Sequence, residues 1–273
     1  MGRIDAVRAG RAPPDGSYHF DRLELQSIEA RFLAERAQLR LDGFPELLER
    51  HRFPTRGRAL EIGCGYGLRA QIMASRFPDI EVVALDRSQA LSAAARGDSR
   101  VMALCADLYD LPFPECSFDF IYARLVFMHL RDPLAALRGL GRALRRGGRI
   151  LIEDADRDCM FFEPAPEGLG SFWGKVQEGQ RRMGGDPNIG RKLAPYFKEA
   201  GFHDLAVEAQ PTVGGAHEIE LMARTLLPGL AMYLEPQDRG EAETAIRALA
   251  RLAESPLATF YHFWFAVSGA KPG

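Results

Sequence analysis

The chain has 273 residues, of which 47% are hydrophobic and 26% are charged, so it can bury a substantial core. Its formal net charge of −2 at pH 7 excludes the strongly basic surface that proteins binding nucleic acid or anionic membranes need. We therefore expect one α/β domain that acts on a small molecule, with neither nucleic acid nor a membrane as a partner.

The cysteines and the first residues indicate the cellular location of the protein. Cys64, Cys105, Cys116 and Cys159 show no CxxC spacing, so neither a zinc site nor a disulfide framework is predicted. The opening MGRIDAVRAGRAPPDG lacks the apolar middle of a signal peptide, and no run approaches the roughly 20 apolar residues of a membrane span. These features favour a cytoplasmic protein.

The N-terminal region precedes the predicted core. Residues 1–16 are rich in Gly, Pro and Arg and predict a disordered tail. From Leu23 to Leu39, apolar residues such as Leu25 and Phe32 recur at helical spacing, which predicts an amphipathic helix. We assign residues 17–57 to a helical cap and residues 58–273 to the main domain.

Short apolar runs then alternate with helix and turn signals. The first five are RALEIG (58–63), EVVALD (81–86), RVMALC (100–105), FDFIYA (118–123) and RILIED (149–154). Continuously apolar strands that alternate with helices predict a doubly wound, mostly parallel sheet covered on both faces. Two further strands, at 203–213 and 258–270, bring the predicted α/β sheet to seven strands. We expect the helical segments at 158–200 and 217–253 to be lid insertions over its ligand edge.

Three glycines stand between the first strand and a helix, in LEIGCGYGLRA (60–70). Gly63, Gly65 and Gly67 allow a tight turn in which a ligand lies against bare amides at a helix N-terminus. The run from Gly65 to Ala70 reads as GxGxxA, and Asp86 follows about 20 residues later, as in nicotinamide dinucleotide sites. NAD and S-adenosylmethionine both fit such a turn.

Glu61, just before the glycines, distinguishes between these two cofactors by its charge. A carboxylate there would repel the pyrophosphate of a dinucleotide but attract the cationic amino and sulfonium groups of S-adenosylmethionine. Asp86 would hold the ribose hydroxyls, and Asp107 would accept a hydrogen bond from the adenine amino group while Leu108 contacts the ring. A single acid at the end of a strand often only caps a helix. The three acids in this order together favour S-adenosylmethionine.

The motifs ALEIGCGYG, VVALDRS, CADLYDLPFPECSFDFIYARLVFMHLRDP and ALRRGGRILIED follow in order over about residues 58–154. They resemble class I S-adenosylmethionine-dependent methyltransferases, in the branch similar to ubiquinone-pathway C-methyltransferases and natural-product methyltransferases. The resemblance implies a Rossmann-like methyltransferase fold, S-adenosylhomocysteine as product and a small-molecule methyl acceptor. It also implies a cofactor site formed by Glu61, Gly63, Cys64, Gly65, Asp86, Arg87, Ala106, Asp107, Leu108 and Arg124.

Four residues are candidates for acid–base chemistry. His129 follows the fourth strand, and it either serves as general base or only holds the next loop. Tyr18 either folds over the cofactor or packs against the first helix. His217 begins a lid helix, and Asp154 ends the fifth strand.

Aromatic residues concentrate in the predicted lid. Phe161, Phe172 and Trp173, with Gln177 after them, predict a binding wall for a medium-sized, partly aromatic or lipophilic acceptor. Ordinary packing of a helix is the alternative.

The acids Glu153, Asp154, Asp156 and Asp158 raise the question of a divalent cation. Because neighbours on a strand point to opposite faces, only some of them can converge, and we expect no metal. Three readings remain open: a methyltransferase, an NAD-dependent oxidoreductase, and a methyltransferase-like protein with a role in cyclisation or cofactor sensing. A homodimer is one option for the assembly.

Overall fold

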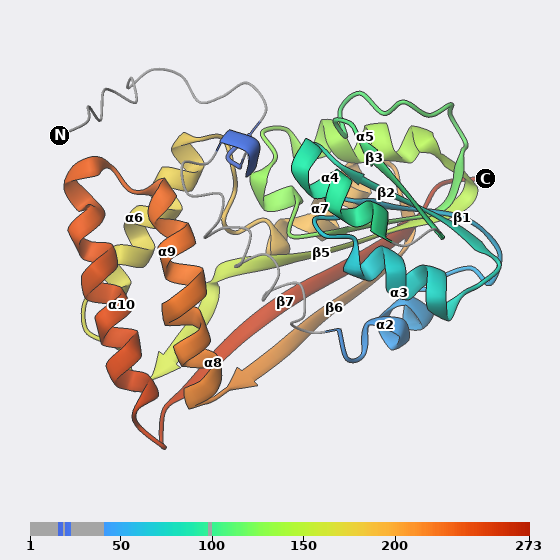
Figure 1. The fold of residues 1–273 in the computed structure, drawn as a ribbon. Helices are drawn as coiled ribbons and strands as arrows, with labels where there is room; N and C mark the ends of the chain where they lie inside the picture. The colour runs from blue at the N-terminus through green and yellow to red at the C-terminus, as the bar shows by residue number, and fades with distance from the viewer. Residues whose placement is uncertain (1–15, 19, 23–40, 98–99) are drawn as a thin grey trace.

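The computed structural model describes residues 16–18, 20–22, 41–97 and 100–273 (Figure 1). The predicted tail, apart from Gly16, and the predicted helix from Leu23 to Leu39 lie outside these residues. Within the described ranges, no helix is both long and apolar enough to span a membrane.

The strands of the described chain form one seven-stranded sheet in the order β3-β2-β1-β4-β5-β7-β6 (Figure 1). They are β1 (Gly57–Ile62), β2 (Ile80–Asp86), β3 (Val101–Cys105), β4 (Phe118–Arg124), β5 (Leu144–Glu163), β6 (His203–Gly214) and β7 (Thr259–Ala270). Strands β1 to β5 pair in parallel, whereas β7 is antiparallel to both β5 and β6. The predicted doubly wound, mostly parallel α/β sheet is confirmed.

Helices cover both faces of the sheet, as continuously apolar strands require. They are α2 (Phe44–Arg50), α3 (Leu68–Arg76), α4 (Gln89–Ala94), α5 (Pro133–Ala143) and α7 (Leu193–Glu199). One apolar core joins α5 and α7 to the strands, with Leu137 and Phe197 fully buried. A second joins α2 and α3 to them through Leu48 and Met73. Asp132 caps α5, because its carboxylate accepts the Ala135 N–H at 2.8 Å.

Strand β5 continues beyond the carboxyl edge of the parallel strands, together with β6 and β7 (Figure 1). Our sequence prediction ended this strand at residue 154 and assigned residues 158–163 to a helical insertion, which is wrong. Residues 160–163 pair with residues 259–262 of β7, so the backbone hydrogen bonds of an antiparallel partner fix them as strand.

The far end of these three strands carries a separate helical layer, which we call the lid (Figure 1). It consists of α6 (Leu169–Arg182), α8 (Ala216–Leu221), the π-helix η5 (Met222–Leu226), α9 (Leu227–Leu230), η6 (Ala231–Tyr233) and α10 (Arg239–Ala253). The lid has its own apolar core. The α-helical hydrogen-bond ladder is interrupted where this π-helix meets α9, because Pro228 has no N–H to bond the carbonyl four residues earlier.

Candidate functional site

The glycine turn after β1 has the left-handed backbone that its sequence predicts. Gly63, Gly65 and Gly67 have φ values of 65°, 54° and 73°. A Cβ on Gly63 would lie 2.3 Å from Val126 Cγ2, so this position must stay bare. A Cβ on Gly65 would meet no atom within 4 Å in the described chain, which leaves open space above the turn for a ligand. The turn is therefore both tightly built and open on one side.

Asp86, at the end of β2, fixes this turn to the next strand. Its Oδ2 accepts the Gly65 N–H at 2.9 Å, and its Oδ1 accepts the Ser88 N–H at 2.9 Å. Burial raises the pKa of Asp86, while the hydrogen bonds from Ser88 and Gly65 act in the opposite direction. Each carboxylate oxygen keeps a further lone pair that can accept a ligand hydroxyl.

Glu61 lies on β1 directly below the turn and is 4% exposed. Burial raises the pKa of Glu61 to about 8, although the charge of Arg69 opposes this rise. Among the described residues, Glu61 Oε2 has no hydrogen-bond partner. A buried carboxylate oxygen that lacks a partner is costly, and a ligand ammonium group would supply the missing donor.

The other predicted cofactor residues surround the same space. Asp107 Oδ1 accepts the Tyr109 N–H at 2.8 Å, which fixes the carboxyl group after β3. The Arg124 guanidinium lies 4.9 Å from the centre of the Trp264 ring. All ten predicted positions line one cavity: Glu61, Gly63, Cys64, Gly65, Asp86, Arg87, Ala106, Asp107, Leu108 and Arg124. Parallel strands bring them together, because β1 to β4 all end at one edge.

This cavity has a volume of about 510 Å³ and extends from the glycine turn to the lid. Its inner part holds the acids of β1 and β2, with Tyr18 and Phe20 among the lining residues. Its outer part is mainly apolar and contains side chains from the extended strands and the lid: Met160, Phe260, His262, Trp264, Leu221, Met222, Thr225, Leu226, Leu230, Met232 and Tyr233. A single cavity thus joins a polar compartment to an apolar one.

Residues 60–152 match the family model described as a methyltransferase domain. Methyltransferase str2 of Strobilurus tenacellus is 32% identical over 143 residues, which are 52% of this chain and 51% of that protein. The 27-O-demethylrifamycin SV methyltransferase of Amycolatopsis mediterranei is 33% identical over 158 residues, 55% of this chain and 56% of that protein. Residues 60–152 therefore form a methyltransferase domain, of the kind that uses S-adenosylmethionine.

A solved structure agrees with this family in its fold. Phosphoethanolamine N-methyltransferase 2 of Haemonchus contortus, in complex with S-adenosyl-L-methionine, superimposes with a TM-score of 0.57 at 20% identity, covering 85% of this chain and 53% of that one. The match to this methyltransferase domain supports S-adenosylmethionine, in place of a nicotinamide dinucleotide, as the cofactor. The alignments span only about half the length of the two sequence relatives.

His129 lies where the two compartments meet. It ends the short helix η3 (Phe127–His129), and its Nδ1 lies 3.2 Å from Ser17 Oγ and 3.3 Å from Tyr233 Oη. The Tyr18 ring is centred 5.1 Å from the His129 ring. His129 and Tyr18 both line the cavity, so the fold brings two of the four acid–base candidates together.

The other two candidates lie elsewhere. Asp154 is fully buried behind η3, where its Oδ2 accepts the Met128 N–H at 3.1 Å. Burial raises the pKa of Asp154 to about 7, while the backbone hydrogen bonds from Ala155 and Met128 oppose the rise. His217 is exposed in the first turn of α8 and does not line the cavity. Neither residue reaches the space in which an acceptor would bind.

The aromatic residues predicted as an acceptor wall do not line the cavity either. Phe172 is fully buried and Trp173 nearly so, because α6 packs this face into the apolar core of the lid. Phe161 is 51% exposed and stacks on Tyr261, whereas Gln177 donates to Asp158 Oδ1 at 3.1 Å. The alternative stated above, helix packing, holds for Phe172 and Trp173.

Sequence reasoning missed the residues that do form the outer compartment. Phe260, His262 and Trp264 alternate along β7, so their side chains share the face that lines the cavity. The alternation of side chains along FYHFWF (260–265) was the sequence pattern from which this face could have been predicted. Tyr233 gave no comparable signal, because only the folding of the lid brings it to His129.

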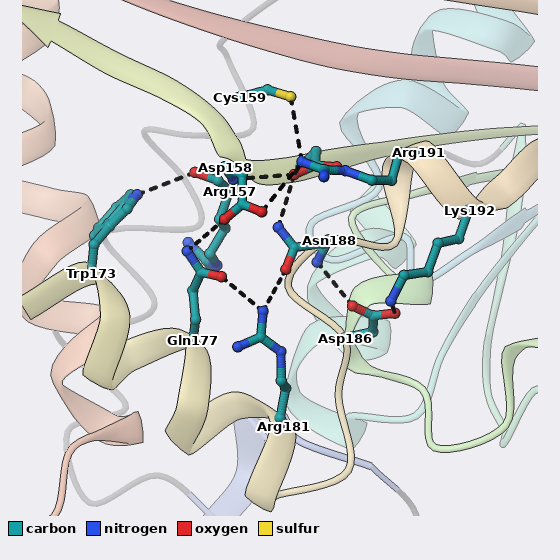
Figure 2. Close-up of polar contacts among 11 residues, drawn as sticks. Arg157, Asp158, Cys159, Trp173, Gln177, Arg181, Asp186, Asn188, Arg191 and Lys192 are labelled. Carbon is teal, nitrogen blue, oxygen red and sulfur yellow. Dashed lines mark hydrogen bonds and ion pairs between the residues drawn. The ribbon is translucent and has the colours of Figure 1, made fainter. Parts of the chain in front are cut away.

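The acids at residues 153–158 of β5 have protein partners rather than a shared centre, and Figure 2 shows Asp158 between Gln177 and Arg191. Glu153 accepts a hydrogen bond from the Tyr122 hydroxyl, Asp156 from Asn188 and Arg191, and Asp158 from Gln177 and Arg191. The described residues contain no group of three or more His, Cys, Asp or Glu side chains that could hold a metal ion.

Proposed function

We propose that this chain transfers a methyl group from S-adenosylmethionine to a small-molecule acceptor bound under the lid. The observation that carries the proposal is the single cavity of about 510 Å³, which joins the cofactor residues to an apolar compartment. Ligand sites of this size are typically apolar with a few placed polar groups. The proposal extends the family assignment to an activity of this chain.

The residues of the inner compartment fit the cofactor. S-adenosylmethionine supplies a methyl group that is already activated by attachment to a cationic sulfur. Glu61 offers a buried carboxylate oxygen to the ammonium group, and Asp86 offers oxygen atoms to ribose hydroxyls. Asp107 and Leu108 line the position that we assign to adenine. The work of the protein is then to orient the acceptor and exclude water.

The acceptor compartment favours a medium-sized, largely apolar molecule. Its walls include Met160, Met222 and Met232, whose flexible side chains adapt to irregular shapes. The name of the Amycolatopsis relative, which acts on 27-O-demethylrifamycin SV, and the composition of this compartment together support a natural product or another secondary metabolite as the acceptor.

His129 is the residue that we propose as general base for a hydroxyl acceptor. Histidine can accept a proton near neutral pH, and His129 lines the cavity at the junction of the compartments. The hydroxyls of Ser17 and Tyr233 lie within 3.3 Å of its Nδ1 and hold the ring in place. Tyr18 then packs against the His129 ring and takes no part in the proton transfer.

Calorimetric titration with S-adenosylmethionine, S-adenosylhomocysteine and NAD tests the cofactor half of the proposal. We expect the first two to bind and NAD not to bind. Incubation with S-adenosylmethionine labelled in its methyl group, over a panel of hydroxylated aromatic acceptors, tests the transfer. Cofactor binding without transfer to any acceptor would contradict the proposed activity and favour a sensing or cyclisation role.

A further inference from the structure

The outer compartment contains a carboxylate that comes from the lid. Four acids of the described chain line the cavity, and three of them, Glu61, Asp86 and Asp107, belong to the cofactor side. The fourth is Glu218, in the first turn of α8. Helix α8 follows β6 at the end of the extended strands that lies away from the glycine turn (Figure 1). Glu218 therefore lies on the side of the cavity that faces away from the cofactor residues.

The chain around Gly214 brings Glu218 next to an aromatic ring. Gly214 pairs with Phe260 of β7, and a Cβ on this glycine would lie 2.2 Å from Phe260 Cε1 and 2.9 Å from Glu218 Cβ. The bare backbone at this position thus allows Phe260 and Glu218 to pack side by side. Both residues line the cavity. A carboxylate attracts a cation by its charge, and an aromatic ring attracts it by its quadrupole.

Local structure uses only one oxygen of this carboxylate. Glu218 Oε2 accepts the Gly215 N–H at 2.9 Å, as the third helical residue of a capping box does. Within the residues that the structure describes, the Glu218 side chain has no other hydrogen bond and no ion pair. Because Glu218 is half-buried in a mainly apolar compartment, its negative charge lacks a compensating group there.

The cationic residues of the same cavity belong to other elements. Arg69 comes from α3, Arg87 follows β2, Arg124 ends β4 and Arg157 lies on β5, and each of them interacts with other protein groups. The missing partner of Glu218 must therefore come from a ligand. A ligand hydroxyl could donate a hydrogen bond to Glu218 but would leave its charge uncompensated, whereas an ammonium group supplies both the donor and the opposite charge.

We infer that the acceptor carries an ammonium group, and that Glu218 binds it beside the Phe260 ring. This inference rests on the proposed function, because it assumes that the outer compartment holds the acceptor. The ammonium group anchors the molecule at the lid, while a different group of the acceptor lies near His129 and receives the methyl group. The acceptor is thus a largely apolar amine.

The test compares serotonin with 5-hydroxytryptophol. The two compounds share the ring and its hydroxyl group, and they differ in an ammonium group against an uncharged hydroxyl at the end of the same side chain. Calorimetry at pH 7 on the full chain, saturated with S-adenosylhomocysteine, measures both affinities. We expect serotonin to bind about 10- to 100-fold more tightly, because a hydrogen bond between two charged groups is stronger than one from a neutral donor.

Glu218→Gln removes the charge but keeps an oxygen that can accept the Gly215 N–H, so the start of α8 stays capped. We expect this variant to lose the preference for serotonin and to keep its affinities for 5-hydroxytryptophol and S-adenosylhomocysteine. Glu220→Gln is the matched control, because Glu220 lies on the same helix but is exposed and does not line the cavity. It should keep the preference for serotonin.

Equal binding of the two compounds by the wild type, or binding of neither, would overturn the inference. A preference that survives in Glu218→Gln, or that is lost equally in Glu220→Gln, would overturn it as well. Failure of S-adenosylhomocysteine to bind would instead contradict the proposed function, so the two failures are distinguishable.

Discussion

Replacing Glu61 by glutamine tests the electrostatic basis of cofactor selection. In the ligand-free protein, burial raises the pKa of Glu61 to about 8, so this carboxyl group is mostly protonated at pH 7. Binding of the cationic cofactor favours the ionised form, so the side chain must release a proton when the cofactor binds. Wild-type affinity for S-adenosylmethionine should therefore increase with pH up to about 8.

The size of the effect follows from this shift. Each pH unit below the raised pKa costs about 1.4 kcal/mol of binding free energy, which is a tenfold change in Kd. Between pH 6 and pH 8 the ionised fraction of Glu61 rises from about 1% to about 50%, so its contribution to affinity increases about 50-fold. Glu61→Gln has nearly the same shape but cannot ionise, so it lacks this dependence. Above pH 8 the variant should bind more weakly by about 1.5–3 kcal/mol, the range for a hydrogen bond to a charged group.

Calorimetry at several pH values between 6 and 8.5, in buffers of different ionisation enthalpy, measures both Kd and the number of protons released. The amino group of the ligand titrates in the same range, but identically with both proteins, so the difference between them isolates Glu61. Parallel pH dependences for wild type and Glu61→Gln would refute the reasoning.

The same shift also predicts the stability of the ligand-free protein. Because the folded-state pKa of Glu61 is raised, its stabilising contribution is complete below about 4.5 and is lost as the pH rises through about 8. Glu61→Gln should therefore have a higher Tm than the wild type at pH 9 but not at pH 4. Thermal unfolding followed by circular dichroism checks this, and a Tm difference that does not change with pH would contradict it.

Three further predictions concern the turn and η3. Asp86→Asn should weaken binding of S-adenosylmethionine by on the order of 2–4 kcal/mol, since an amide cannot accept both backbone N–H groups; calorimetry measures this, and an unchanged Kd would argue against the site. His129→Asn should lower the methyl-transfer rate by about 10²–10⁴ with the cofactor Kd unchanged; a weaker Kd at an unchanged single-turnover rate would exclude the base. Burial raises the pKa of Asp154 to about 7, so its carboxylate loses its charge and its hydrogen bond from the Met128 N–H weakens as the pH falls through 7. The methyl-transfer rate of the wild type should fall over the same pH range. Asp154→Asn should be slow at every pH, and a pH–rate profile matching that of the wild type would count against this role.

The cofactor half of the molecule could be predicted from the sequence because its determinants are local. Each strand from β1 to β4 is a short apolar run, so the sequence itself shows at which residue the strand ends. In a parallel sheet these ends meet at one edge, so Glu61, Asp86 and Asp107 gather there whatever the distant segments do. The pattern of glycines after β1 likewise fixes the turn by backbone sterics alone.

The acceptor half depended on the tertiary structure. Composition placed aromatic residues in the lid, but it could not show that α6 turns Phe172 and Trp173 into the core of the lid. The register between β5 and β7 places a bulge at residues 156–159, and no local pattern encodes that pairing. Tyr233 meets His129 across 104 residues of chain. Residues distant in sequence acquire a shared function only through packing, because contact between them depends on how whole elements are arranged.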